Sequence, residues 1–287
     1  MKIQSFFDEA TNTFTYLVYD TETQACVLID PILDYDFSSG TISESSAEKV
    51  LEEIQKKSLN LLYILETHIH ADHLSGAQVF KKHFPKAQTV IHESVKTVQK
   101  SFSELFNFDG FDCSGSQFDK LVKDGDEIDL PFSKIKVLHT PGHTPACVCF
   151  HLENTLFTGD SIFMPDFGTG RCDFPGGSAK ALYQSVKTKI YSLSDETKIF
   201  VGHDYGTGGR EILNETTVSE QKNKNVHIKA QTSEEEFIQF REDRDGTLSP
   251  PKLLFQSLQV NIRGGRLPDV ESNGMMYLKF PLKLKLK

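Results

Sequence analysis

Residues 66–77, with the sequence ETHIHADHLSGA, gather three histidines and one aspartate within six positions, directly after the apolar run NLLYIL. Alternate positions along an extended turn direct their side chains to the same side, so His68 and His70 aim two imidazoles at one point. Neutral imidazole and carboxylate are suitable ligands for divalent transition metals. The stretch therefore predicts the first half of a metal site at the end of a strand.

The composition is that of an ordinary globular protein, with 287 residues of which 38% are hydrophobic and 25% charged. A chain of this length forms one large α/β domain or two smaller ones. The net charge of −9 argues against nucleic acid or an anionic membrane surface as the main partner.

The opening residues MKIQSFFDEATNTFTY lack an apolar leader segment, and no stretch approaches the length of a membrane span. Five cysteines at scattered spacings, without a secretion signal, fit a reducing compartment better than a disulfide framework. We therefore expect a soluble protein of the cytoplasm.

Strand and helix patterns alternate along most of the chain, which predicts the α/β class. The expected strands cover residues 13–20, 25–31, 60–67, 88–92, 133–143, 146–153, 154–160 and 198–206. The expected helices cover residues 45–57, 71–84, 95–106 and 178–193. From about residue 211 the pattern is helix-rich up to Pro250 and Pro251, and the chain then ends in a short apolar segment and KLKLK. Without an internal repeat or a low-complexity linker, we expect one domain with a C-terminal extension.

Four polar loops each follow an expected strand. After the histidine cluster these are TPGHT with His143, TGD with Asp160 and VGHDYG with His203. Functional groups of open α/β sheets collect where strands end. A single strand-end histidine is most often a surface or hydrogen-bonded residue, but that explanation does not account for four such loops together. We predict that they converge on a metal.

The motifs THIHADH, TPGHT, FTGD and VGHDY, in this order, resemble those of the metallo-β-lactamase superfamily over nearly the whole globular part. The resemblance implies an αββα sandwich with the metal at one edge, between two similar halves. Residues 1–210 would form the catalytic domain, with residues 211–287 as a helix-rich extension packed on it. Asp30 in LIDP matches the family's first motif, an aspartate that supports the metal loop from behind; locally it also reads as a strand-end turn residue.

The ligands suffice for two metals, and the superfamily does not decide the reaction. One grouping has Asp160 as a bridge, with His68, His70 and His143 on one ion and Asp72, His73 and His203 on the other. Such a pair generates hydroxide near neutral pH and polarises a carbonyl. Spacing alone thus favours a hydroxyacylglutathione (glyoxalase II-type) thiolester hydrolase with two zinc or mixed metal ions.

Two other segments resemble the persulfide dioxygenases, or sulfur dioxygenases, of the same superfamily. They are GR-x-DF, with Arg171, Asp173 and Phe174, and HDY, with His203, Asp204 and Tyr205. The segment LQVNIRGGRLP, residues 258–268, resembles the bacterial β-lactamase hydrolase-like subgroup.

This resemblance implies oxidation of glutathione persulfide by O2 to sulfite and glutathione, a reaction of sulfide detoxification. It also implies one iron(II) per chain, held by His68, His143 and Asp160. Such a set of two histidines and one carboxylate leaves open positions on the metal. The other motif residues would then orient ligands and waters without holding a second metal: His70, Asp72, His73 and His203.

Arg171 is the residue expected to bind a substrate carboxylate, since its planar guanidinium forms two-point contacts. The alternative is a structural ion pair with Asp173 or Asp204. Tyr205 and Phe174 are expected beside it in the substrate site, and Arg171, Tyr205 and Asp173 are the expected catalytic side chains. Cys172 is either a reactive thiol next to a cation or, as is commoner, a small buried residue.

Three classes of function remain: an oxidoreductase, a thiolester hydrolase, and a non-catalytic sensor of sulfur or metal. The sensor is disfavoured because every ligand position is retained. The expected partners are a small thiol persulfide and O2, and the apolar C-terminal extension is compatible with a homodimer. The sequence does not identify the thiol that carries the sulfur or the enzyme that supplies it.

Overall fold

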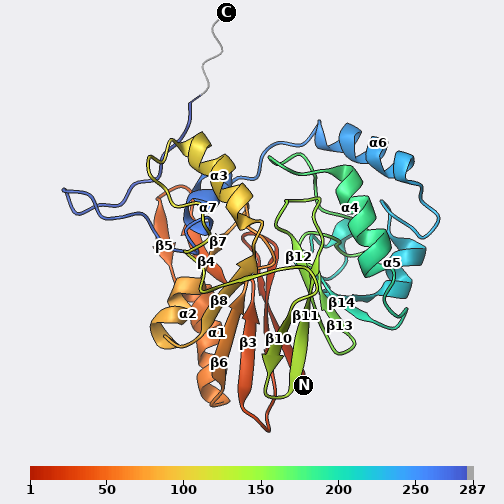
Figure 1. Ribbon diagram of the computed structural model, residues 1–287, viewed down its shortest axis with the longest axis horizontal. Coiled ribbons are helices and arrows are strands. Elements are labelled where there is room, and N and C mark those ends of the chain that lie inside the picture. The colour runs from red at the N-terminus through yellow and green to blue at the C-terminus, as the bar shows by residue number, and fades with distance from the viewer. Residues whose placement is uncertain (283–287) are drawn as a thin grey trace, which may run out of the picture.

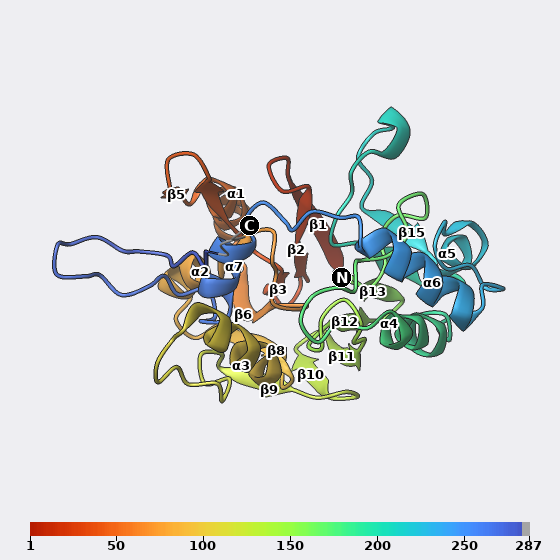
Figure 2. The ribbon, with the colours of Figure 1, turned by 90° about the horizontal axis from the view of Figure 1, so that it is seen from above.

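Two six-stranded β-sheets face each other at the centre of the molecule, and helices cover both outer faces (Figure 1; Figure 2). The structure is a computed structural model that describes residues 1–282. The arrangement confirms the expected αββα sandwich of the α/β class. Within the described residues, no helix combines the length and the apolar character needed to cross a membrane.

The first sheet has the strand order β1-β2-β3-β6-β8-β9 and changes from antiparallel to parallel pairing at β3. Its strands are β1 (Lys2–Asp8), β2 (Thr13–Tyr19), β3 (Ala25–Ile29), β6 (Asn60–Leu65), β8 (Gln88–His92) and β9 (Lys120–Val122). The helices on its side are α1 (Ser45–Lys56), α2 (Ala77–His83), α3 (Val95–Phe106) and α7 (Leu254–Asn261). Every residue of β2 and β3 is buried, because the sheet is covered on both faces.

The second sheet has the strand order β10-β11-β12-β13-β14-β15. Its strands are β10 (Glu127–Leu130), β11 (Ser133–His139), β12 (Val148–Leu152), β13 (Thr155–Phe157), β14 (Lys198–Phe200) and β15 (Glu215–Thr217). The helices on its side are α4 (Ala179–Ser185), which continues as a π-helical turn (Val186–Ile190), α5 (Val218–Lys224) and α6 (Glu234–Asp245). A small third sheet contains β5 (Thr41–Ser43), β4 (Ile32–Asp36) and β7 (Leu74–Ser75), and a 3₁₀ turn covers Thr207–Gly209.

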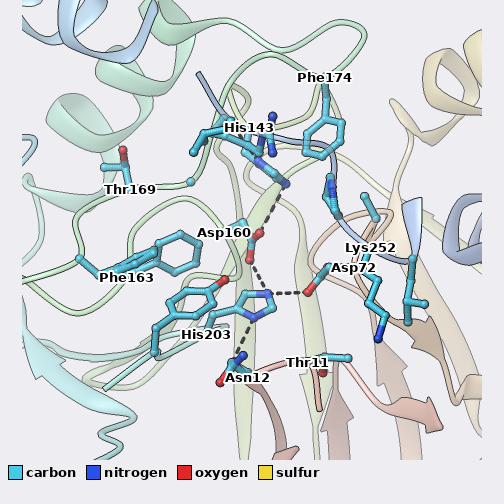
Figure 3. Close-up of a pocket in the computed structure, with 18 of the residues that line it drawn as sticks. Thr11, Asn12, Asp72, His143, Asp160, Phe163, Thr169, Phe174, His203 and Lys252 are labelled. Carbon is cyan, nitrogen blue, oxygen red and sulfur yellow. Dashed lines mark hydrogen bonds and ion pairs between the residues drawn. The ribbon is translucent and has the colours of Figure 1, made fainter. Parts of the chain in front are cut away.

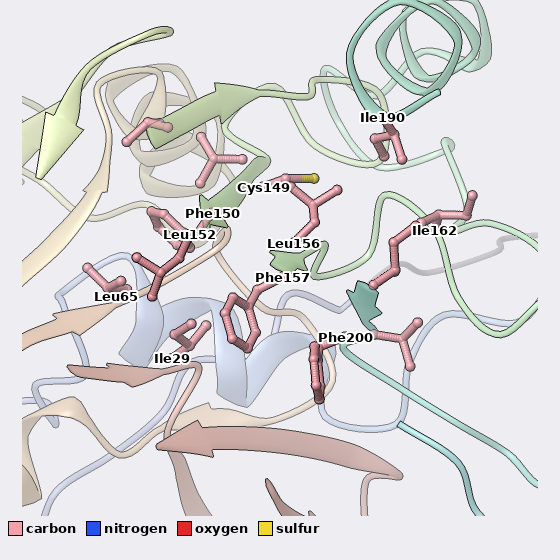
Figure 4. Packing of buried hydrophobic residues seen from close by; sticks show 14 of the residues in the cluster. Ile29, Leu65, Cys149, Phe150, Leu152, Leu156, Phe157, Ile162, Ile190 and Phe200 are labelled. Carbon is pink, nitrogen blue, oxygen red and sulfur yellow. The ribbon is translucent and has the colours of Figure 1, made fainter. Parts of the chain in front are cut away.

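Apolar side chains fill the space between the two large sheets (Figure 4). Ile29 and Leu65 of the first sheet belong to the same buried cluster as Phe150, Leu156 and Phe157 of the second. Each such side chain stabilises the fold by about 1.5–3 kcal/mol when it is fully buried. The sandwich therefore holds the loops at its edge on a rigid support.

The structure differs from the sequence prediction in the metal loop, because α2 begins at Ala77 and residues 71–76 are not helical. Leu74 and Ser75 instead pair with β4, and a Cβ atom at Gly76 would lie 2.5 Å from the carbonyl oxygen of Ile32. The helix predicted from residue 71 is therefore wrong for its first six residues. This extended path frees the side chains of Asp72 and His73 to enter the site.

The C-terminal residues 211–282 contact both halves of the sandwich. Their strand β15 completes the second sheet, whereas α7 packs against β7 and α3 on the first sheet's side. Helix α7 follows the two prolines, where an apolar segment without a specified structure was expected. The terminal KLKLK lies outside the described residues. The boundary at residue 210 stays a prediction.

Candidate metal centre

The four loops predicted to converge do so at one edge of the sandwich (Figure 3). Each follows a strand that the core holds in place: the histidine cluster follows β6, His143 follows β11, Asp160 follows β13 and His203 follows β14. Three of these strand ends belong to the second sheet and one to the first. The site is therefore built across the two halves.

His68, His143 and Asp160 offer one ligand atom each, and these atoms all lie within 4.8 Å of one another. Asp160 Oδ2 is 3.4 Å from His143 Nε2 and 3.9 Å from His68 Nε2. All three residues are buried. The structure thus brings together the trio that the resemblance to persulfide dioxygenases implied.

The protonation of the trio suits a cation. His143 Nδ1 donates to the carbonyl oxygen of Arg171 at 2.6 Å, which leaves a lone pair on Nε2. Burial, and to a lesser degree the neighbouring His70, holds the pKa of His68 well below its usual range, so this imidazole is neutral. Burial opposes the ionisation of Asp160, but the imidazoles around it hold its pKa well below the usual value.

Unpartnered polar atoms also point to a bound ion. His68 Nε2 and His73 Nε2 are buried, and neither has a hydrogen-bond partner within the described chain. Burying such atoms without a partner costs free energy, which coordination to a metal removes. The imidazoles of His68 and His143 and the carboxylate of Asp160 fit a divalent transition metal.

Asp30 lies behind the metal loop, as the first motif implied. Its carboxylate accepts hydrogen bonds from the backbone N–H of Thr67 at 2.7 Å and from the Thr67 hydroxyl at 2.8 Å. Its Oδ1 atom also lies 3.0 Å from His70 Nε2, and Glu66 Oε2 lies 3.7 Å from the same nitrogen. Burial disfavours the charged imidazole, yet these two carboxylates raise the pKa of His70 to about 9.

A second group of potential ligands consists of His70, Asp72 and His73, whose ligand atoms also lie within 4.8 Å of one another. The grouping differs from the two-metal arrangement considered for the sequence, in which His70 shared an ion with His68 and His143. His203 lies between the two groups. Its Nε2 is 3.3 Å from Asp160 Oδ1 and 3.4 Å from Asp72 Oδ2 (Figure 3).

Asn261, at the end of α7, holds the metal loop by its backbone. Its Nδ2 donates to the carbonyl oxygens of His70 and His73, both at 2.8 Å, and its Oδ1 accepts from the Ser75 N–H at 2.8 Å. The residue is buried and lies at least 186 positions from each partner. Sequence reasoning missed its role, and the resemblance of LQVNIRGGRLP to one subgroup was the single available signal.

A pocket of about 430 Å³ opens beside the trio. Phe163, Phe167, Phe174 and Tyr205 form its aromatic part; the ring of Phe174 meets that of His143 edge-on at 5.2 Å. Tyr205 stacks on Phe167 with 4.3 Å between ring centroids. These contacts place the predicted substrate residues Phe174 and Tyr205 at the pocket.

The pocket wall at residues 169–171 approaches the site closely. A Cβ atom on Gly170 would lie 2.2 Å from the carbonyl oxygen of Asp160, so any larger residue would displace the loop. Cys172 is 8% exposed, and burial raises the pKa of its thiol to about 12. The thiol is therefore protonated and inert at neutral pH, in agreement with a small buried residue.

Arg171 lines the pocket but is already paired. Its Nε and Nη2 donate to the two carboxylate oxygens of Asp173, both at 2.6 Å, and its Nη1 donates to the Ser249 carbonyl at 2.8 Å. Three of its five N–H donors are used in this way. The structural partner is Asp173 rather than Asp204, because Asp204 is buried against Arg210.

Residues 211–282 contribute further pocket residues that the sequence did not indicate. His227 precedes α6, Arg241 and Arg244 belong to α6, and Lys252 precedes α7. No motif marked these residues, because their place at the pocket depends on how α6 and α7 pack.

The fold and the clustered ligands define a metal-binding αββα protein. In agreement, the family model described as the metallo-beta-lactamase superfamily matches residues 9–203. The chain belongs to this superfamily.

Several relatives are similar over most of the chain. Glyoxylase B2 of Dictyostelium discoideum is 45% identical over 283 residues, which are 98% of this chain and 97% of the relative. The beta-lactamase hydrolase-like protein of Xylella fastidiosa (strain 9a5c) is 46% identical over 98% of this chain, which spans 64% of that longer protein. The mitochondrial persulfide dioxygenase ETHE1 of Homo sapiens is 33% identical over 92% of this chain and 88% of its own.

Among solved structures, ETHE1 from Myxococcus xanthus superposes with a TM-score of 0.74. It is 30% identical, and the match covers 93% of this chain and 100% of that one. The predicted resemblance to persulfide dioxygenases and β-lactamase hydrolase-like proteins is confirmed. These relatives carry different names, so kinship supports an enzyme with a metal without deciding between oxygenase and hydrolase.

Proposed function

We propose that the protein is an iron(II)-dependent persulfide dioxygenase that oxidises glutathione persulfide to sulfite and glutathione. The trio of His68, His143 and Asp160 carries the proposal, because it offers two imidazoles and one carboxylate to a single ion. Such a ligand set is typical of non-haem iron(II) oxygenases. The likeness to human persulfide dioxygenase over 92% of the chain supports the same reaction.

Iron(II) on the trio would supply the electron-transfer chemistry that lets a persulfide react with O2. In the overall reaction the outer sulfur gains two oxygen atoms from O2 and one from water. Glutathione is released, together with two protons. Asp72 lies at the pocket, and its carboxylate can accept a proton. Burial disfavours the charged imidazole of His203, yet Asp160 and Asp72 raise its pKa to about 10, so this ring is already protonated.

Other side chains position the reacting groups. The carbonyl of Arg171 orients His143, and the ion pair of Arg171 with Asp173 holds that segment of backbone in place. Phe163 and Phe174 give the pocket an apolar wall that limits the access of water to the sulfur. His70 is held by Asp30 and is left outside the trio.

A thiolester hydrolase with two metals is the second candidate. It is favoured by one observation, the additional ligand group of His70, Asp72 and His73. The relative named Glyoxylase B2 points in the same direction. In this case His203 and Asp160, which lie 3.3 Å apart, would stand between the two ions.

Metal content and oxygen consumption separate the two candidates. We expect about one iron per chain, O2 uptake with glutathione persulfide, and sulfite as the product. A two-metal hydrolase would instead contain about two ions per chain and cleave S-lactoylglutathione without O2. Thiolester cleavage without persulfide-dependent O2 uptake would overturn the proposal.

A further inference from the structure

Two cations of the pocket have no anionic partner. Among residues 1–282, no carboxylate oxygen lies within 4 Å of a side-chain nitrogen of Arg244 or Lys252, although both residues line the pocket. The other arginines at or near the pocket are neutralised: Arg171 by Asp173, Arg210 by Asp166 and Asp204, and Arg241 by Asp245. Free positive charge is therefore concentrated here in a protein of net charge −9.

Lys252 and Arg244 reach the pocket from the C-terminal part of the chain. Figure 3 shows Lys252 on the same side as Asp72, across the pocket from Phe163. Its Nζ lies 5.3 Å from the ring centroid of Phe37, which also lines the pocket. Both cations are exposed, so they remain hydrated and available to a ligand.

His227 adds a neutral donor to the same pocket. Its Nδ1 accepts a hydrogen bond from the Thr169 N–H at 3.0 Å, so the neutral ring carries its proton on Nε2. Partial burial, and to a lesser degree the positive charges of Arg241 and Arg244, lowers the pKa of His227 to about 3. No acceptor for the Nε2 proton is found among the described residues, and the side chain lines the pocket.

We infer that Arg244, Lys252 and His227 form a subsite that binds the anionic groups of the thiol that carries the sulfur. This inference rests on the proposed function, and it assigns substrate selection to the C-terminal segment. Glutathione has two carboxylates at opposite ends of an extended tripeptide, and the pocket offers two cations, Arg244 and Lys252. The cavity of about 430 Å³ is of the size that binds small molecules. Phosphates of a larger thiol such as coenzyme A share the same anionic chemistry.

Binding to the metal-loaded protein tests the subsite directly. Calorimetry with glutathione, its glycine ethyl ester and coenzyme A would be compared for the wild type, R244A and K252A. We expect each substitution to weaken glutathione binding by about 3- to 10-fold, as for charge-assisted contacts at an open rim. R244K should keep most of the affinity. The control K100A removes an exposed cation that does not line the pocket.

The glycine ethyl ester of glutathione shows which of the two cations contacts the glycine carboxylate. In the wild type, glutathione should bind more tightly than its ester, and this difference should disappear in the variant whose cation meets the glycine carboxylate. Wild-type affinity for glutathione in both R244A and K252A would overturn the inference, as would an equal loss in K100A. Tighter binding of coenzyme A than of glutathione, lost in the same variants, would keep the anion subsite and reassign its ligand to a phosphorylated thiol.

The inference and the proposed function fail separately. If the protein shows no persulfide-dependent O2 uptake but loses glutathione affinity in R244A and K252A, the proposed reaction is wrong and the subsite stands. If O2 uptake is observed and the variants bind glutathione as the wild type does, the reaction stands and the subsite is wrong.

Discussion

Replacing Asn261 with alanine should weaken the metal centre from a distance, because this residue contacts the backbone of the metal loop and none of the trio. The change removes three buried hydrogen bonds of 2.8 Å, to the carbonyls of His70 and His73 and from the N–H of Ser75. A buried polar group left unsatisfied costs about 1–3 kcal/mol. Water can enter the space of the missing amide, so we take the lower end, about 3 kcal/mol in total.

This loss of stability should be measurable as a shift of the melting temperature. About 3 kcal/mol corresponds to roughly 6–12 °C for a domain of about this size. In addition, metal affinity should fall by about 10-fold, because the residues that hold ligand loops in place typically contribute this much. Both quantities can be measured on one preparation, by thermal unfolding of the metal-free protein and by competition with a chelator.

Gln259→Ala is the matched control in the same helix. Gln259 is also buried and makes three hydrogen bonds, to the carbonyls of Phe255 and Lys279 and from the N–H of Lys279. These partners lie away from the metal loop, so the variant should lose stability and keep its metal affinity. Unchanged metal affinity in Asn261→Ala, or an equal loss in Gln259→Ala, would refute the reasoning.

Four other outcomes are expected. Alanine in place of His68, His143 or Asp160 should remove most of the iron and nearly all dioxygenase activity. Full iron occupancy in any of these three variants would disprove the assignment. Asp72→Asn and His203→Ala should keep most of the iron while activity falls by about 10- to 100-fold, and complete loss of metal would favour the two-metal hydrolase. Arg171→Ala should lower the melting temperature and reduce the activity with glutathione persulfide and with a small persulfide alike, because this side chain is hydrogen-bonded to Asp173 and Ser249. A loss of activity confined to glutathione persulfide, at unchanged melting temperature, would instead support the role of Arg171 in binding the substrate. His227→Gln should flatten the decline in folding stability between about pH 6.5 and pH 3. Burial and the arginines of α6 lower the pKa of His227 in the folded protein to about 3, so only the unfolded chain takes up a proton at this residue in that range. An unchanged dependence of stability on pH would contradict this.

Local rules were enough for the general plan of the molecule. The patterns at residues 13–20, 25–31 and 60–67 predicted strands, and the structure has strands of the first sheet at residues 13–19, 25–29 and 60–65. Ligand types and their positions after strands pointed to a metal, since functional groups collect where strands end. The prediction failed at residues 71–76, where helical spacing was outweighed by pairing with β4 and by the close approach of Gly76 to Ile32.

The sequence by itself determined which residues are able to hold a metal, because imidazoles and carboxylates at strand ends identify themselves by type and spacing. Only the tertiary structure decided how they are grouped, since it paired His70 with Asp30 and left it outside the trio. It likewise paired Arg171 with Asp173, and it brought Asn261 and Lys252 to the site from the far end of the chain. These contacts join segments that are remote in sequence or depend on competing partners. They follow from the packing of helices and loops on the sandwich, which no local pattern encodes.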